Sequence, residues 1–287
     1  MTRGKATVIG FGAVLLWALL ALLTVGSAPV PPLLLNAITF ALGGALGLVW
    51  IGVSGSWRQL LKVPVGVYLF GTAGLFGYHL LYFSALRLAP PAEASLIAYL
   101  WPLFIVLMSG LLPGERLSPR HVIGALIAFA GAALIVTRSA SGVDTAHGKG
   151  LVLALAAALT WAAYSVVSRR FGTVPTASVA VFCLVTALLS AIAHRLLEPT
   201  IWPTTALGWV SCTALGLGPV GLAFYVWDIG VKRGDIQLLG VSAYAAPLVS
   251  TLILIVSGLA PATPEIALAA VLIAGGALVA ARAGAKR

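Results

Sequence analysis

The second half of this 287-residue chain repeats its first half at a displacement of about 145 residues. The same residue types recur at matching places after that displacement. The matches are Tyr99 with Tyr244, Pro102 with Pro247, Leu103 with Leu248, Leu107 with Leu252, Pro119 with Pro264 and Gly131 with Gly276, while Trp17 matches Trp161 at a displacement of 144. Such a repeat predicts two copies of one structural unit.

The composition indicates that the chain folds in a lipid bilayer. Hydrophobic residues make up 61% of the chain and charged residues 8%, against roughly 25% charged residues in a soluble domain. Ten apolar stretches approach the roughly 20 residues that one crossing needs, and short breaks with Pro, Gly or charge separate them. The spans are predicted at about residues 6–26, 31–52, 65–88, 92–112, 119–138, 149–171, 175–195, 205–231, 236–258 and 264–283.

Each repeat therefore contains five spans, and an odd number places the second repeat upside down relative to the first. The predicted fold is an all-α polytopic membrane protein with ten transmembrane helices in an inverted five-plus-five repeat. The first repeat covers residues 1–138 and the second covers residues 149–287. Residues 139–148 are predicted to form an outer connecting loop, which is too short to fold alone.

The net charge of +10 could indicate nucleic-acid binding, but the placement of the basic residues favours a membrane protein. With the N-terminus inside, thirteen basic residues fall on the inner side and four on the outer side, as short cytoplasmic loops require. The inner set is Arg3, Lys5, Arg58, Lys62, Arg116, Arg120, Arg169, Arg170, Lys232, Arg233, Arg282, Lys286 and Arg287; the outer set is Arg87, Arg138, Lys149 and Arg195. Both termini are predicted to be cytoplasmic, and no nucleic-acid partner is expected.

The first apolar run is predicted to remain in the protein as a helix. It is about 20 residues long, whereas the apolar core of a cleaved signal peptide has about 7 to 15, and its Trp17 has a repeat mate in Trp161. Cys183 and Cys212 both fall inside predicted spans, where a thiol usually fills apolar space rather than forming a disulfide.

A family resemblance rests on the stretch Pro-Gly-Glu-Arg-Leu-Ser-Pro at 113–119 and on the small-residue helix through Gly124 and Gly131 that follows it. These features resemble the drug/metabolite transporter superfamily in its ten-helix EamA-type form, over essentially the whole chain. The second repeat departs from the motif, because Glu115 falls opposite Ala260. Aromatic residues at mid-span make the chain most similar to the YddG-type aromatic amino-acid exporters of that superfamily.

The resemblance implies a secondary transporter of the bacterial inner membrane. It would export amino acids, aromatic and other apolar ones favoured, or related small metabolites by alternating access, and it could act as a monomer. A central cavity would lie between the first, third, fourth, sixth, eighth and ninth helices. No cofactor or metal is expected, because the sequence contains no phosphate loop, nucleotide fingerprint or zinc-ligand spacing.

The candidate substrate-binding residues are aromatic or uncharged side chains at mid-span. A phenol buried in a bilayer needs a polar partner that lipid does not offer, so cavity lining is favoured over simple packing. The set is Trp17, Tyr78, His79, Tyr82, Tyr99, Trp101, Trp161, Tyr164, Ser165, Phe224 and Tyr244. On the eighth span, Phe224, Tyr225, Trp227 and Asp228 take the places of His79, Leu80, Tyr82 and Phe83. Trp50, Trp57, Trp202 and Trp209 are expected at the membrane interfaces instead.

Several residues have two readings that the sequence leaves open. His79 is either a proton carrier or a neutral imidazole that bonds a neighbouring tyrosine. Pro102 and Pro247 are predicted hinges, because each removes a backbone hydrogen bond at matching places. Asp228 is predicted to pair with Lys232, four residues later. Gly216, Gly218, Pro219 and Gly221 indicate either a kink or close packing.

Two rival functions were compared with amino-acid export. A multidrug or sugar-phosphate carrier is less favoured, since the spans lack a central carboxylate, Lys or Arg that a cationic or anionic substrate would require. An intramembrane serine protease could use Ser54 of Gly52-Val53-Ser54-Gly55 with His79 as its base. Ser54 is predicted at a cytoplasmic helix end and His79 at mid-membrane, which argues against an enzyme.

Overall fold

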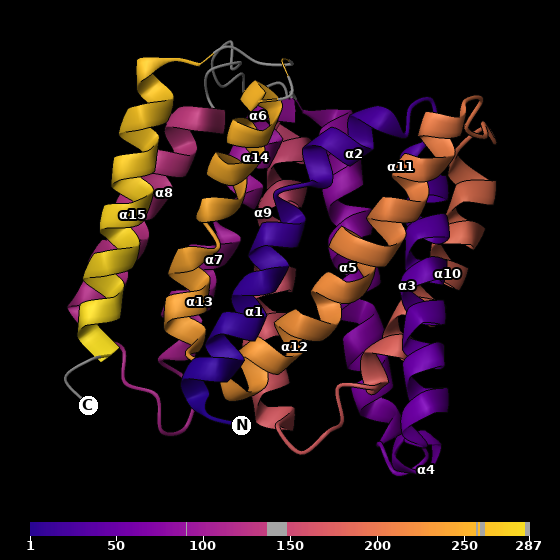
Figure 1. Ribbon diagram of the computed structural model, residues 1–287, viewed down its shortest axis with the longest axis horizontal. Helices are drawn as coiled ribbons and strands as arrows, with labels where there is room; N and C mark the ends of the chain where they lie inside the picture. The colour runs from indigo at the N-terminus through magenta and orange to yellow at the C-terminus, as the bar shows by residue number, and fades with distance from the viewer. Residues whose placement is uncertain (90, 137–147, 257, 259–261, 285–287) are drawn as a thin grey trace.

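The computed structural model describes residues 1–89, 91–136, 148–256, 258 and 262–284, and the regular elements in them are helical. The helices stand side by side as a bundle, and the N-terminus and the end of the last helix lie at the same end of it (Figure 1). We call this end, which includes the short helix Trp57–Leu60, the lower end, and the opposite one the upper end. Arg138, Ala260 and the predicted connecting loop, except Gly148, lie outside the described residues.

The first repeat contains five helical segments that correspond to its five predicted spans. Its first and fourth spans are each divided into two helices, whereas the other three are single helices. The elements are α1 (Arg3–Trp17), α2 (Leu20–Gly26), α3 (Pro32–Ser54), α4 (Trp57–Leu60), α5 (Val65–Leu88), α6 (Pro91–Ala98), α7 (Trp101–Ser109) and α8 (Pro119–Val136).

The second repeat also contains five spans, but its first span is one long helix. Its third span contains a π-helical turn, and its fourth span is again divided. The elements are α9 (Gly148–Ser168), η3 (Arg169–Phe171), α10 (Ser178–Leu197), α11 (Ala206–Leu217), the π-helical η4 (Gly218–Leu222), α12 (Ala223–Arg233), α13 (Ile236–Ser242), α14 (Ala245–Val256) and α15 (Pro264–Gly284).

Within the described residues, eight helices are long and apolar enough to cross a membrane. Two shorter apolar helices, Ala94–Ser109 and Pro119–Leu134, stand at the predicted fourth and fifth spans. All ten predicted spans thus have a helical counterpart, and the predicted fold class is confirmed. Cys183 and Cys212 are buried free thiols, as expected.

The most extensive contacts between helices join a helix of one repeat to a helix of the other, as an inverted repeat requires. Helix α1 packs on α12, and the repeat mates of these two helices, α9 and α5, pack on each other. Helix α3 packs on its own mate α10, and α8 packs on its mate α15. Figure 1 shows α1 rising from the lower end and α9 descending from the upper end. The two repeats therefore form one body rather than two domains.

Small residues allow α8 and α15 to approach closely at one side of the bundle. A Cβ placed on Gly276 would lie 2.8 Å from the amide nitrogen of Ala128. A second approach between these helices is similarly close, because a Cβ on Gly131 would lie 2.9 Å from the carbonyl oxygen of Ala269. The small-residue pattern of the fifth and tenth spans is therefore used for helix packing, the role that small residues commonly have in membranes.

The fourth and ninth spans are interrupted at matching places. The breaks fall at Tyr99 and Leu100 between α6 and α7, and at Ala243 and Tyr244 between α13 and α14. Pro102 is the second residue of α7, and Pro247 is the third residue of α14. Each proline thus starts a half-helix instead of bending a continuous one, since a helix tolerates proline in its first turn. Their role as hinges stays a prediction.

Candidate functional site

Aromatic side chains from six segments meet at the centre of the bundle, with Trp17 among them at the end of α1. The ring centroid of Trp17 lies 5.0 Å from that of Trp227, 5.8 Å from its repeat mate Trp161 and 6.0 Å from Trp101. We call the whole group the aromatic cluster. Its members are Trp17, Phe40, Tyr78, His79, Tyr82, Phe83, Trp101, Trp161, Tyr164, Phe224 and Trp227.

The π-helical turn η4 fixes the position of Trp17. The indole Nε1 of Trp17 donates to the carbonyl oxygen of Pro219, at 3.1 Å. A π-helical turn disturbs the regular pairing of backbone groups, so it can offer a carbonyl to a side chain. Close packing occurs at the same turn, because a Cβ on Gly221 would lie 3.1 Å from the Cα of Gly43. Both readings of this glycine-rich segment, a local distortion and close packing, are therefore correct.

The part of the aromatic cluster that lies toward the lower end is buried. Trp227 is 1% exposed and Trp161 is 3% exposed. The indole of Trp227 donates to the hydroxyl of Ser165 at 3.1 Å, so its polar atom is satisfied without water. Tyr164 and Phe224 are buried beside these rings. This half of the cluster is a packed aromatic plug.

The part that lies toward the upper end, together with the nearby Tyr99, is less completely buried. Tyr78, Tyr82 and Tyr99 are half-buried. The rings of Tyr78 and Tyr82 stack with centroids 5.9 Å apart and planes 6° apart, as their one-turn spacing on α5 predicted. The hydroxyl of Tyr82 lies 3.0 Å from that of Ser95 on α6. Apolar ring faces and polar phenol oxygens are thus presented on the same side of the plug.

His79 bonds the backbone instead of a tyrosine. Its Nδ1 lies 2.7 Å from the carbonyl oxygen of Leu75 on the preceding turn. A carbonyl oxygen only accepts, so Nδ1 carries the hydrogen and Nε2 has the lone pair in the neutral ring. The expectation that a neighbouring tyrosine would satisfy the imidazole is therefore corrected. The ring of Tyr78 makes only an edge contact with the imidazole, with centroids 5.1 Å apart.

Phe40 belongs to the aromatic cluster, although no sequence pattern predicted this position. It is fully buried on α3, its ring stacks on Phe224 at 5.4 Å, and it meets His79 edge to face at 5.0 Å. The second span therefore contributes to the centre, in addition to the first, third, fourth, sixth and eighth spans. A phenylalanine inside an apolar span looks like any other lipid-facing residue, and its repeat mate is Val185.

Tyr244 lies apart from the aromatic cluster, contrary to its predicted place in the lining. It is fully buried among small and aliphatic residues of α7, α8 and α15, with Phe129 at a centroid distance of 5.9 Å. Its hydroxyl accepts the amide hydrogen of Leu103 at 3.1 Å. The structure brings the other predicted aromatic residues except Tyr99 together in the aromatic cluster, places Tyr99 near Tyr82, and leaves Tyr244 in the scaffold.

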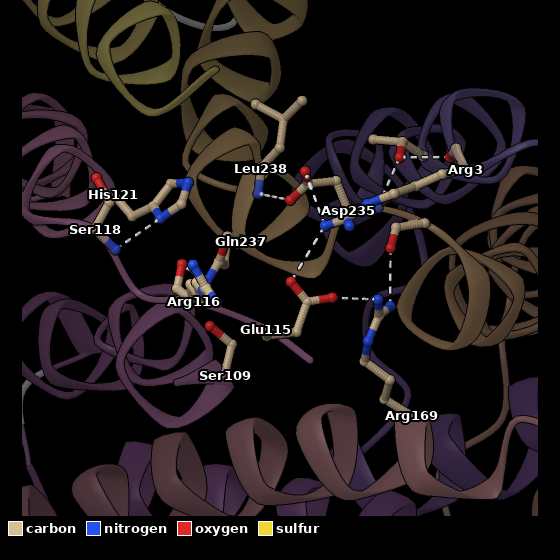
Figure 2. A network of polar contacts seen from close by, with 12 residues as sticks. Arg3, Ser109, Glu115, Arg116, Ser118, His121, Arg169, Asp235, Gln237 and Leu238 are labelled. Atoms are coloured by element: carbon tan, nitrogen blue, oxygen red, sulfur yellow. Dashed lines mark hydrogen bonds and ion pairs between the residues drawn. The ribbon is translucent and has the colours of Figure 1, made fainter. Parts of the chain in front are cut away.

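A network of charged side chains holds the lower end together. Glu115, from the motif at 113–119, pairs with Arg169 and lies 3.2 Å from the guanidinium of Arg3. Arg3 also lies 3.1 Å from a carboxylate oxygen of Asp235. Figure 2 shows these four residues, the lower network, converging from α1, the segment after α7, η3 and the turn before α13. The Glu115 carboxylate is only 4% exposed, so its pairs are shielded from water.

Backbone groups complete the lower network. Arg169 donates to the carbonyl oxygens of Val231 and Gly234, at 2.9 and 2.8 Å. Arg169 thereby ties the lower end of the sixth span to the end of α12. Nearby, Asp228 and Lys232 pair at 2.9 Å on α12, so the predicted local ion pair is present. Sequence reasoning missed the network because its members come from four distant segments.

A smaller polar group is present at the upper end. The carboxylate of Glu198 pairs with Arg87 at the end of α5 and lies 3.1 Å from Nδ1 of His194. It also accepts the amide hydrogens of Leu33 and Leu34 at 3.0 and 3.3 Å, where the start of α3 attracts a negative charge. The group therefore joins the upper ends of the second, third and seventh spans, but it does not include the first, fourth, sixth or ninth span.

The arrangement removes the protease hypothesis. The Ser54 hydroxyl lies 2.7 Å from that of Ser56 at the lower end of α3, whereas His79 bonds Leu75 at the centre of α5. Within the described residues, no group of three or more His, Cys, Asp or Glu side chains could hold a metal ion. Ser54 and His79 therefore do not form the serine-histidine pair that the protease hypothesis requires.

Comparison with known proteins assigns both repeats to one family. The EamA-like transporter family matches residues 4–137 and residues 148–282. The chain is 54% identical over 282 residues to the aromatic amino acid exporter YddG of Ancylobacter novellus, covering 98% of each chain. It is 26% identical over 298 residues to the aromatic amino acid exporter YddG of Escherichia coli K12, covering 97% of each.

A solved structure has the same fold. One crystal structure superposes with a TM-score of 0.93 at 53% sequence identity, covering 97% of this chain and 98% of that chain. The fold described above has therefore been observed experimentally.

Proposed function

This chain belongs to the EamA-like transporter family, and on that premise we propose that it exports aromatic and other apolar amino acids across the cytoplasmic membrane. The aromatic cluster is the observation that supports this substrate class. A ring-bearing side chain can stack on Tyr78 and Tyr82, which are accessible and parallel, while phenol oxygens are available to the zwitterion. The relatives that carry the name of aromatic amino acid exporter support the same substrate class.

The proposed mechanism is alternating access between the two ends of the bundle. The lower network and the buried half of the aromatic cluster close the lower end, whereas the half-buried tyrosines lie toward the upper end. The basic residues of α1, α4 and η3 support the proposal that the lower end, with both termini, is the cytoplasmic one. All residues of the site come from one chain, so a monomer is the proposed transporting unit.

The rival carriers lack support in the described residues. Near the centre, the ionisable groups are His79, which bonds a backbone carbonyl, and Asp228, which already pairs with Lys232. A multidrug or sugar-phosphate carrier would need an unpaired charge near its substrate. An uncharged aromatic centre fits a molecule whose own charges cancel.

Transport by purified protein in liposomes tests the substrate class. We expect labelled Phe, Tyr and Trp to exchange across the membrane, Leu to exchange more slowly, and Lys and Glu to remain at the level of empty liposomes. Equal transport of Lys or Glu would contradict the proposal. The same assay with and without a pH gradient shows whether protons are coupled to transport.

Cysteine labelling tests the orientation separately. Cysteines placed at Lys149 and at Arg170, both exposed, lie at opposite ends of the sixth span. In a background without Cys183 and Cys212, we expect an impermeant maleimide added to intact cells to label the Lys149→Cys variant only. Labelling of both variants, or of Arg170→Cys alone, would contradict the proposed orientation.

A further inference from the structure

Tyr99 and Tyr244 are repeat mates in two different environments. Tyr244 is fully buried, and its phenol oxygen accepts the amide hydrogen of Leu103 at 3.1 Å. Tyr99 is half-buried beside Tyr82, and its phenol makes no hydrogen bond within the part of the chain that the structure describes. The repeat counterpart of this bond would join the amide of Leu248 to the phenol oxygen of Tyr99.

The two half-helices that follow these tyrosines begin one residue apart in the repeat. In α7, which begins at Trp101, the amide of Phe104 donates to the carbonyl of Leu100 at 2.9 Å. Leu103 comes one residue before Phe104, so its amide is one of those that a helix start leaves without a partner in the helix. In α14, which begins at Ala245, Leu248 is the fourth residue, so it lies one place further into its half-helix than Leu103, the third residue of α7.

We propose that Tyr244 and Tyr99 are positioning residues that alternate as acceptors for the start of the opposite half-helix. In the structure described here, Tyr244 accepts the free amide of Leu103. In the oppositely open state, α14 begins one residue later and Tyr99 accepts the amide of Leu248. At the same time α7 begins one residue earlier, so that the amide of Leu103 bonds the carbonyl of Tyr99 and Tyr244 is released.

The exchange replaces the bond between the phenol of Tyr244 and the amide of Leu103 with its repeat counterpart. Inverted repeats make such an exchange natural, because the second state can be produced when each repeat adopts the conformation of the other. The exchange also reaches the binding site. Trp101 is the first residue of α7 and contacts Trp17 and Trp161, so a shift in the helix start moves an aromatic ring of the cluster.

The proposal rests on the alternating access of the proposed function but on no particular substrate, so it is tested without one. The reporter is a cysteine in place of Ser109, a fully buried residue at the lower end of α7, in a protein without Cys183 and Cys212. A second reporter replaces Ser84, which is half-buried toward the upper end of α5. The rate of maleimide labelling is measured in lipid nanodiscs, where both faces are accessible.

Removal of each phenol oxygen should shift the equilibrium in opposite directions. Tyr244→Phe should raise the labelling rate of the Ser109→Cys reporter by roughly fivefold, because one neutral hydrogen bond that favours the present state is lost. Tyr99→Phe should lower that rate and raise the rate of the Ser84→Cys reporter. The double variant should return both rates to within about twofold of the wild-type values.

Tyr68→Phe is the matched control. Its phenol also bonds a backbone group, here by donating to the carbonyl of Leu60, but both residues belong to the same repeat, so neither rate should change. Equal shifts in the same direction for Tyr99→Phe and Tyr244→Phe would overturn the proposal, as would an unchanged rate for Tyr99→Phe. Tyr99 is half-buried, so that variant remains informative even if Tyr244→Phe does not fold. Failure of aromatic amino-acid transport would leave this test unaffected.

Discussion

The two crossings that join the repeats near the lower and upper ends are repeat mates with different residues at their contact. Where α1 crosses α12, Gly10 faces Gly230, and a Cβ placed on Gly230 would lie 2.6 Å from the Cα of Gly10. Where α5 crosses α9, the corresponding positions are Ala85 and Ala154, both fully buried in one cluster. At these positions the lower crossing brings two glycine backbones together, whereas the upper crossing has a methyl group on both helices. The close backbone approach of the upper crossing lies nearer the helix ends, where a Cβ on Gly150 would lie 2.7 Å from the amide nitrogen of Ala89.

This difference agrees with the distribution of charge and of accessible rings. The lower end combines the glycine contact with the lower network and the buried half of the aromatic cluster. The upper end has the alanine contact, the group around Glu198 and the half-buried tyrosines. One architecture, repeated and inverted, is therefore tightly closed at one end and less tightly at the other.

The largest effect is expected from a bulky side chain at the lower crossing. Gly230→Leu would place its side chain against the backbone of Gly10, so the lower end could not close without displacing α1. Transport should fall by roughly 5- to 150-fold, since overpacking of this kind costs roughly 1 to 3 kcal/mol in the closed state. Substrate exchange in liposomes measures the loss.

The matched variant for the upper crossing is Ala85→Gly. It removes a methyl group without adding volume, so the upper end could close further and transport should remain within about threefold of wild type. Equal loss of transport in both variants would show that the two crossings do not differ in function.

The next largest effect is expected at the accessible half of the aromatic cluster. Tyr78→Ala removes a ring that stacks on Tyr82 and contacts Trp161. We expect transport of Phe to fall by roughly tenfold, in line with about 0.5 to 1.5 kcal/mol for an aromatic contact beyond its buried area. Trp57→Ala, which changes a half-exposed residue of α4 away from the cluster, is the control with normal insertion and near wild-type transport. A Tyr78→Ala variant with wild-type transport would contradict the binding site.

A moderate effect is expected when the charge of the lower network is removed. Glu115→Gln leaves Arg3 and Arg169 without their shared carboxylate, so the lower end should open more often. Labelling of a cysteine at Ser109 should rise by roughly fivefold, because Arg3 is largely accessible to water and part of the pair energy is screened. Glu198→Gln should not raise the labelling at Ser109, since Glu198 acts at the other end. Equal increases in the two variants would remove the distinction between the ends.

The smallest effect is expected at His79. His79→Gln retains a side chain that can donate to the carbonyl of Leu75, and it should keep transport within about twofold with the same response to a pH gradient. Liposome assays at equal and unequal pH separate exchange from coupling. A variant that exchanges substrate but no longer responds to the gradient would identify His79 as the proton carrier.

The fold was readable from the sequence because it depends on local signals. Apolar length, prolines and glycines at the breaks, and the displacement of 145 residues predicted the ten spans and the inverted repeat, whereas the family was indicated by the resemblance of the stretch at 113–119 and the helix that follows it. The site was only partly readable. The helical spacing of Tyr78 and Tyr82 predicted a shared face, whereas Phe40 carried no signal that distinguishes it from a lipid-facing residue.

The repeat itself misled the prediction for Tyr244. Identical residues at matching places suggest identical environments, but a transporter in one state holds its two repeats in different conformations, so Tyr99 and Tyr244 separate. The lower network was also beyond prediction. Glu115 meets Arg3 and Arg169 from segments 112 and 54 residues away, and sequence pattern alone gives no pairing over such separations.

The absence of a repeat mate for Glu115 has a kinetic consequence. A carrier driven only by gradients comes to the same final concentration ratio whichever end it prefers to keep shut. The preference instead changes the concentration at which each face responds, because the apparent dissociation constant is the intrinsic one divided by the fraction of molecules open to that face. The lower network joins four segments on the proposed cytoplasmic side, whereas the group around Glu198 does not reach the first, fourth, sixth or ninth span. With this stronger closure on the proposed cytoplasmic side, the protein would respond weakly to ordinary cytoplasmic levels of its substrate and strongly to an excess. It would work as an overflow valve.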